Sequence, residues 1–181
     1  LNQEDVLRML QHPSSTQAVY SPTQMSYRDL VDYIESKFHA YIRQAIPAIQ
    51  SNLQKVIKAH SDNHPELFRI KEIVDESFND LLQHLMKEEN VLFPLIRNIE
   101  SSLQPQSVLM PIRMMEIEHD TEGDRYKEIS DITQQYTPPA DACNTYKYLY
   151  TLLSEFETNL HEHIHIENNI LFDRIKQQFQ N

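Results

Sequence analysis

The sequence predicts an all-α protein: an up-down-up-down bundle of four helices that follows a short helical or irregular N-terminal segment. The chain has nine prolines but only one glycine among 181 residues, so it contains few of the tight turns that β-hairpins need. The stretches between the prolines are rich in Leu, Ile, Glu, Gln and Lys, which are helix formers. In four of these stretches, apolar residues recur every three or four positions, as on one face of a helix.

The N-terminal segment covers residues 1–25, and the bundle covers residues 26–181. Within the segment we expect a short helix near Gln3–Leu10 and then a polar linker. The first bundle helix is expected over about 26–60, with Ser26 as its N-cap and Asp29 completing a capping box. Pro47 should kink this helix, because proline cannot donate the backbone hydrogen bond at its position.

The other three helices are expected over roughly 66–99, 106–134 and 141–177, separated by proline-containing connections. Each helix has an inward-facing row of residues, called its seam below. The four seams are His39, Ile42, Ile46, Ile49, Leu53, Val56 and His60; Ile70, Val74, Ser77, Leu81, His84, Glu88, Val91 and Leu95; Val108, Ile112, Met115, His119, Glu122, Tyr126 and Ile129; and Leu149, Leu153, Phe156, Leu160, His163, Glu167 and Ile170.

Polar residues interrupt the four seams at one level of the bundle. The six candidate metal ligands are His39, His84, Glu88, His119, His163 and Glu167. In the second and fourth helices, histidine and glutamate are four apart, so both point to the same side. The segments 84–93 and 163–172 resemble each other, which indicates an approximately twofold site. Counted along antiparallel helices with a rise of about 1.5 Å per residue, the four histidines lie within one turn of the same depth.

A metal explains this layer better than ordinary core packing does. A single buried histidine is usually a hydrogen-bonded core residue, and a buried glutamate costs several kcal/mol unless it is paired. The seams contain no Lys or Arg that could pair with the six residues. We therefore expect metal ligation at this level.

The other five histidines of the chain are not expected to bind the metal at this level. His161 and His165 lie off the seam and should be solvated, with a supporting contact to the site as an alternative for His165. His12 and His64 are expected in loops, and His60 lies about six turns from His39.

The donor types favour two iron ions. Structural zinc usually has four ligands that include thiolate, whereas imidazole with carboxylate suits iron or manganese. Ferritin-like bundles use Glu-x-x-His and more carboxylates. Here we expect the two glutamates to bridge the irons, together with an oxo or hydroxo group.

The rest of the composition excludes several partners. The net charge of -11 argues against nucleic acid and anionic membranes. No apolar run approaches the ~20 residues of a membrane span. The one cysteine, Cys143, fits a reducing compartment and is expected to be a small buried hydrophobe.

Four motifs resemble the hemerythrin-like proteins of the repair-of-iron-centres family over about residues 26–175. They are His84–Pro94, Glu118–Asp120 with Gly123, Pro138–Cys143 and His163–Phe172. The resemblance implies a bacterial cytoplasmic di-iron protein that responds to nitric oxide and oxidative stress and helps to repair iron–sulfur clusters in client proteins. It also implies that the six candidates are the ligands, and that residues 1–25 are the tail of a small N-terminal domain common in the family.

Gly123 stands where oxygen-carrying hemerythrins have a further histidine, four residues after the third-helix ligand. It either permits a close helix contact or leaves an iron open to a small ligand. Three hypotheses of function remain: iron supply or repair for clusters, enzymatic reduction of nitric oxide or a peroxide, and binding of oxygen or nitric oxide for storage or sensing. The oligomeric state stays open.

Overall fold

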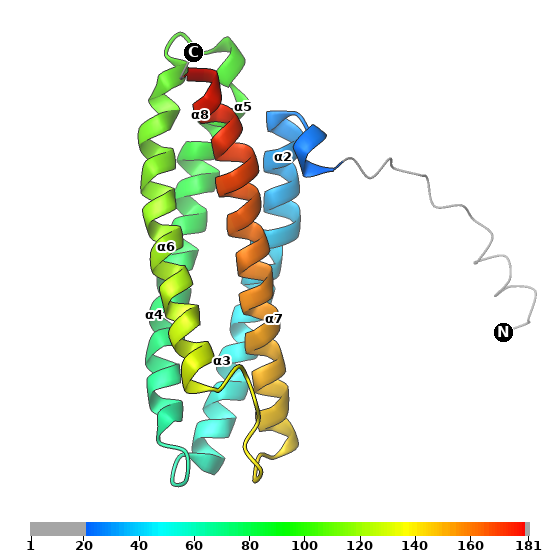
Figure 1. Cartoon of the computed structure of the whole chain (residues 1–181), viewed down its shortest axis with the longest axis vertical. Coiled ribbons are helices and arrows are strands. Elements are labelled where there is room, and N and C mark those ends of the chain that lie inside the picture. Colours follow the sequence, from blue (N-terminus) through cyan, green and yellow to red (C-terminus); the bar gives the residue numbers. More distant parts are fainter. Residues whose placement is uncertain (1–20, 180–181) are drawn as a thin grey trace, which may run out of the picture.

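The computed structural model describes residues 21–179 as four antiparallel columns of helix (Figure 1). The helix expected near Gln3–Leu10 and the loop position of His12 lie outside these residues. The first column is α2 (Tyr27–Ile34), the π-helical turn η2 (Glu35–His39) and α3 (Ala40–His60); the second is α4 (Glu66–Lys87), the π-helical turn η3 (Glu88–Leu92) and α5 (Phe93–Arg97). The third is α6 (Leu109–Ile132), and the fourth is α7 (Asn144–Ile166), the π-helical turn η6 (Glu167–Phe172) and α8 (Asp173–Phe179). Short 3-10 turns, η1 (Pro22–Gln24), η4 (Ile99–Ser101) and η5 (Pro105–Val108), occupy the connections.

The columns alternate in direction along the chain, which confirms the up-down-up-down bundle (Figure 1). The N-terminus of the first column follows the expected capping pattern in part. The Ser26 hydroxyl accepts the Asp29 backbone N–H at 3.1 Å, and it donates to the Asp29 carboxylate at 2.7 Å. α3 runs as one helix through Pro47. Among residues 21–179, no helix is long and apolar enough to cross a membrane.

The predicted seams are confirmed for the first and third columns, except that His60 is only half-buried. The predicted seams of the second and fourth columns are wrong beyond Glu88 and Glu167. Val91 is 51% exposed, and Leu95 and Ile170 are partly exposed. The buried residues are instead Leu92, Phe93, Ile96, Leu171 and Phe172. The physical reason is the π-helical turn that starts at each glutamate, because its wider turn shifts the phase of every later side chain.

Two apolar clusters fill the bundle, one on each side of the polar layer. The main core lies among α3, α4, α6 and α7, and includes Leu53, Val74 and Phe156. The end core lies among α2, α5, α8 and the start of α6, and includes Ile34, Ile96, Ile112 and Ile175. The candidate metal ligands lie between these two clusters.

Candidate metal centre

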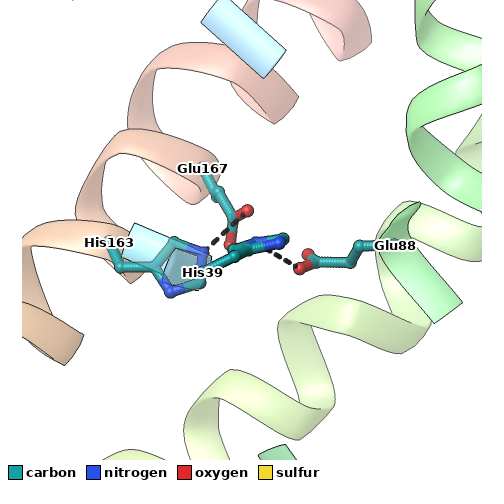
Figure 2. Close-up of side chains that lie close together, drawn as sticks. All are labelled: His39, Glu88, His163 and Glu167. Atoms are coloured by element: carbon teal, nitrogen blue, oxygen red, sulfur yellow. Dashed lines mark ion pairs between the residues drawn. The ribbon is translucent and has the colours of Figure 1, made fainter. Parts of the chain in front are cut away.

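The structure brings all six candidate ligands together. His39, Glu88 and Glu167 are fully buried, and the other three histidines are at most 4% exposed. Their donor atoms form two overlapping groups of four, each with all atoms within 4.8 Å of one another. One group is His39, Glu88, His163 and Glu167, shown in Figure 2; the other is His84, Glu88, His119 and Glu167. Both glutamates belong to both groups, as expected for carboxylates shared by two cations.

Each carboxylate oxygen faces a different imidazole. Glu88 Oε2 lies 3.3 Å from His39 Nε2, and Glu88 Oε1 lies 3.3 Å from His84 Nε2. Glu167 Oε1 lies 3.1 Å from His163 Nε2, and Glu167 Oε2 lies 3.2 Å from His119 Nε2. None of the four oxygens has a hydrogen bond of good geometry, although all are buried. Buried oxygens without hydrogen bonds are costly, so this donor set fits cations placed between the oxygens and the imidazoles.

The π-helical turns position the donors. η2 ends at His39, η3 begins at Glu88, and η6 begins at Glu167. Such turns place a side chain where a regular helix would not, and they are frequent at functional sites. α6 presents His119 from regular helix. Three of the four columns therefore depart from α-helical geometry at the level of the candidate site.

Outer hydrogen bonds orient three of the four imidazoles. The Nδ1 atoms of His39, His84 and His119 lie 2.7, 2.8 and 2.8 Å from side-chain oxygens of Glu89, Glu118 and Asn168. In a neutral ring whose Nδ1 donates to these oxygens, Nε2 carries no proton and faces the centre, which is the tautomer that a metal needs.

Aromatic rings stack on three of the four candidate histidines. Phe38 stacks on His163 with ring centroids 5.3 Å apart, and Phe93 stacks on His39 at 5.5 Å. Phe172 stacks on His119 at 6.1 Å. These stacked rings leave little freedom for the three imidazoles to turn.

The charges in the centre compensate one another. Burial alone would lower the pKa of the His84 imidazole, but the Glu88 carboxylate and its neighbours raise that pKa to about 9. Burial alone would raise the pKa of Glu167, but the imidazoles of His163 and His119 hold it well below its usual value. The carboxylates are therefore ionised, which is the form that binds metal.

A pocket of about 280 Å³ leads from the surface to one side of the centre. It opens between α4 and α6, where Asp80, Lys87 and Glu118 line it, and it reaches His84 and His119. His39 is not among its lining residues. His163 also lines the pocket, so the pocket reaches three of the four candidate histidines, with at least one from each group of four.

Gly123 does not serve helix packing. A Cβ atom added at this glycine would have no neighbour within 4 Å. The close-contact alternative is therefore wrong, and open space lies beside α6 one turn after His119.

Glu122 is a polar residue of this region that the sequence analysis placed in a seam but not in the site. It is 5% exposed and lines the pocket. Its carboxylate accepts hydrogen bonds from the Ser77 hydroxyl, at 2.6 Å, and from Arg125, and burial raises its pKa. The sequence feature that could have identified Glu122 is its position on the inward face of the helix, three residues from both His119 and Arg125.

The remaining histidines lie away from the centre. His161 and His165 are exposed, as predicted, and the His165 ring contacts Asn169 instead of a candidate ligand. His64 lies in the turn between α3 and α4. The prediction for Cys143 is wrong: this residue is exposed, because it is the N-cap of α7 at an end of the bundle that faces solvent.

The chain is similar to known proteins over most of its length. Residues 31–175 match the family described as the hemerythrin HHE cation binding domain. The chain is 39% identical over 153 residues to a probable iron-sulfur cluster repair protein of Haemophilus influenzae, an alignment that covers 84% of this chain and 67% of the relative. It is 40% identical over 146 residues to iron-sulfur cluster repair protein YtfE of Musicola paradisiaca, covering 81% and 64%.

A protein of the same name from Yersinia pseudotuberculosis is 37% identical over 151 residues, covering 83% of this chain and 66% of the relative. The chain thus spans about two thirds of the length of these relatives. The family match covers most of the helical bundle, including every candidate ligand. Together with the paired His and Glu clusters, it establishes that this chain belongs to the hemerythrin HHE cation-binding domain family.

Proposed function

We propose that the protein holds two iron ions and uses them to help repair damaged iron–sulfur clusters in client proteins during nitrosative or oxidative stress in the bacterial cytoplasm. His39 and His163 would bind one iron, His84 and His119 the other, and Glu88 and Glu167 would bridge the two. The observation that carries the proposal is that each of the four carboxylate oxygens faces a different imidazole.

Iron suits the donor set. The six side chains offer nitrogen and oxygen atoms without thiolate, and such sites favour iron, manganese or copper over structural zinc. Two carboxylates leave a positive charge on two divalent or trivalent ions, which an oxo or hydroxo bridge would balance. The names of the relatives are in accord with a role in cluster repair.

The residues around the centre would hold it in a form able to release or exchange iron. Glu118 and Asn168 orient the imidazoles of His84 and His119, while the pocket gives solvent access to the same pair. Phe38 and Phe93 stack on His163 and His39. When bound, the metal pair supplies iron for transfer or electrons for reaction with a small oxidant.

A second candidate function is binding or reduction of nitric oxide, oxygen or a peroxide. The pocket that reaches His84 and His119, with open space at Gly123, favours it. A role in repair would be supported if a chelator removes the iron readily and if that iron restores the cluster of a damaged client protein. A reduced product formed under steady reductant would support an enzyme, and reversible binding without product would support a sensor or store.

Metal analysis with Mössbauer spectroscopy on protein from iron-fed cells tests the centre. We expect about two irons per chain. His84→Ala and Glu88→Ala should lose most of the iron, whereas the matched controls His161→Ala and His165→Ala should keep it, because both control residues are exposed. One zinc per chain with no iron after iron-fed growth would contradict the di-iron proposal.

Incubation of the iron-loaded protein with an iron–sulfur protein damaged by nitric oxide tests the role in repair. We expect recovery of the client's cluster absorption, and no recovery with Glu88→Ala. Equal recovery with the unchanged protein and with this variant would contradict iron supply from the centre.

A further inference from the structure

The candidate metal centre has an approximate twofold symmetry that exchanges the two groups of four. It pairs His39 with His119, His84 with His163, and Glu88 with Glu167. The stacked phenyl rings obey the same symmetry, because Phe93 lies on His39 and Phe172 lies on His119. The ligands of the first and second columns therefore form one half of the centre, and those of the third and fourth columns form the other half.

The first departure from the symmetry is the residue that follows each shared glutamate. In the first half this residue is Glu89, whose carboxylate lies 2.7 Å from His39 Nδ1. In the second half it is Asn168, whose side-chain oxygen lies 2.8 Å from His119 Nδ1. A carboxylate thus supports one imidazole where a neutral amide supports the related one.

The second departure is the residue that precedes His119 and His39. Before His119 it is Glu118, whose carboxylate lies 2.8 Å from His84 Nδ1. Before His39 it is Phe38, which stacks on His163 with ring planes only 8° apart. The Nδ1 atom of His163 is buried, and no group among residues 21–179 forms a hydrogen bond with it. Within this part of the chain, His163 is the candidate histidine without an outer hydrogen bond.

The cations around the centre follow the same division. Lys87 pairs with Glu118, and Arg43 pairs with Glu89. The twofold-related positions of these two cations hold uncharged residues, Ile166 and Gly123. Carboxylate–cation pairs therefore support the imidazoles of the first half, whereas the corresponding residues around the second half are neutral.

These differences rank the four imidazoles as ligands. An outer hydrogen bond fixes the tautomer and orientation of a ligand histidine, and losing it costs roughly 10–100-fold in metal affinity. A hydrogen bond to a carboxylate is stronger than one to an amide. His163 is therefore the least supported ligand. It belongs to the group with His39, so that group combines the weakest imidazole with a strong one (Figure 2).

The pocket gives water access to this weak ligand. His163 lines the pocket together with His84 and His119. A volume of about 280 Å³ holds several water molecules, so water can replace the imidazole on a cation when His163 lets go. His39, on the other side of the same group, does not line the pocket.

We propose that His163 is the labile ligand of the centre, so that the iron held by His39 and His163 is released first, through the pocket. The inference rests on the proposed function, which supplies the two irons. The second iron stays behind, because Glu118 and Asn168 still hold its two imidazoles.

Release of iron from the loaded protein to an excess of a ferrous chelator, followed by absorbance, tests this inference. We expect two phases of one iron each, with rates that differ at least about tenfold. Phe38→Glu places a carboxylate where the symmetry puts Glu118, and it should slow the fast phase at least about tenfold. The matched control Phe38→Leu removes the ring without adding a carboxylate and should not slow it. Lys37 Nζ lies 4.6 Å from the Phe38 ring centroid, so the new carboxylate meets a cation there.

His163→Ala keeps the test decisive if Phe38→Glu does not fold. This variant should be purified with about one iron per chain, and that iron should leave at the slow rate of the unchanged protein. The inference is overturned if both irons leave in a single phase, if folded Phe38→Glu loses its first iron as fast as Phe38→Leu, or if His163→Ala is purified without iron. Fewer than two irons per chain before the chelator is added would instead count against the proposed function.

Discussion

Replacing Gly123 by alanine should stabilise the protein. A glycine inside a helix costs about 0.8–1.0 kcal/mol relative to alanine, because its backbone loses more freedom on folding. Gly123 lies in the interior of α6, and an added Cβ would meet no atom within 4 Å. The structure therefore adds neither a clash to subtract nor a contact to add, so the expected gain is about 1 kcal/mol. For a chain of this length that corresponds to a rise in Tm of roughly 2–4 °C.

Thermal unfolding followed by circular dichroism measures this gain, with urea denaturation as a check on the free energy. The measurement should be made on metal-free and iron-loaded protein, and the gain should be the same in both, because the new methyl group touches no candidate ligand. A lower Tm for Gly123→Ala would refute the reasoning, since it would mean that the glycine is needed for a close contact. A gain confined to one metal state would show that the methyl group acts on the site.

Three further substitutions or conditions give distinct outcomes. Gly123→His should keep two irons but react with nitric oxide more slowly, because the new imidazole occupies the open position; equal rates in stopped-flow mixing would contradict this. Ser77→Ala should lower the free energy of unfolding by about 1–2 kcal/mol, because the buried Glu122 carboxylate loses a donor; urea denaturation measures the difference, and no change would show that Arg125 alone suffices. In the metal-free protein, the raised pKa of His84 stabilises the fold fully below about pH 6.5, and this stabilisation is lost as the pH rises through about 9. The lowered pKa of Glu167 stabilises the fold above about pH 4.5, and this stabilisation is lost as the solution is acidified. Urea midpoints of metal-free protein should therefore be highest between about pH 4.5 and 6.5, and equal midpoints at pH 6 and pH 9 would argue against it.

The third column shows which parts of the structure could be predicted from the sequence. From Val108 to Ile129 its seam keeps a regular helical period, and every predicted member is buried. His119 could be placed correctly because no irregular turn precedes it in α6. His84 and His163 were found for the same reason, because they lie in regular helix before a π-helical turn. His39, Glu88 and Glu167 each lie at the edge of such a turn, where the phase counted along the adjoining helix still holds.

The parts that could not be predicted depend on geometry that the amino-acid pattern does not encode. Val91 looks like a seam residue, but the π-helical turn from Glu88 rotates it toward solvent. Cys143 is apolar enough for a core, yet its exposure follows from where α7 begins. Glu122 was passed over because its partner Ser77 lies on α4, far away in the sequence, and the two side chains meet only in the folded bundle.

The division of the apolar interior has a consequence for how the protein opens. The main core and the end core are separate clusters, and the layer between them is made of ionisable side chains. Apolar packing transmits cooperativity only where it is continuous, so each cluster is a natural unit of partial unfolding. Amide hydrogens of α2 and α8 should then exchange through openings that leave those of the main core protected. The polar layer thus separates two cooperative units, and a pair of cations held by donors from all four columns would join them into one.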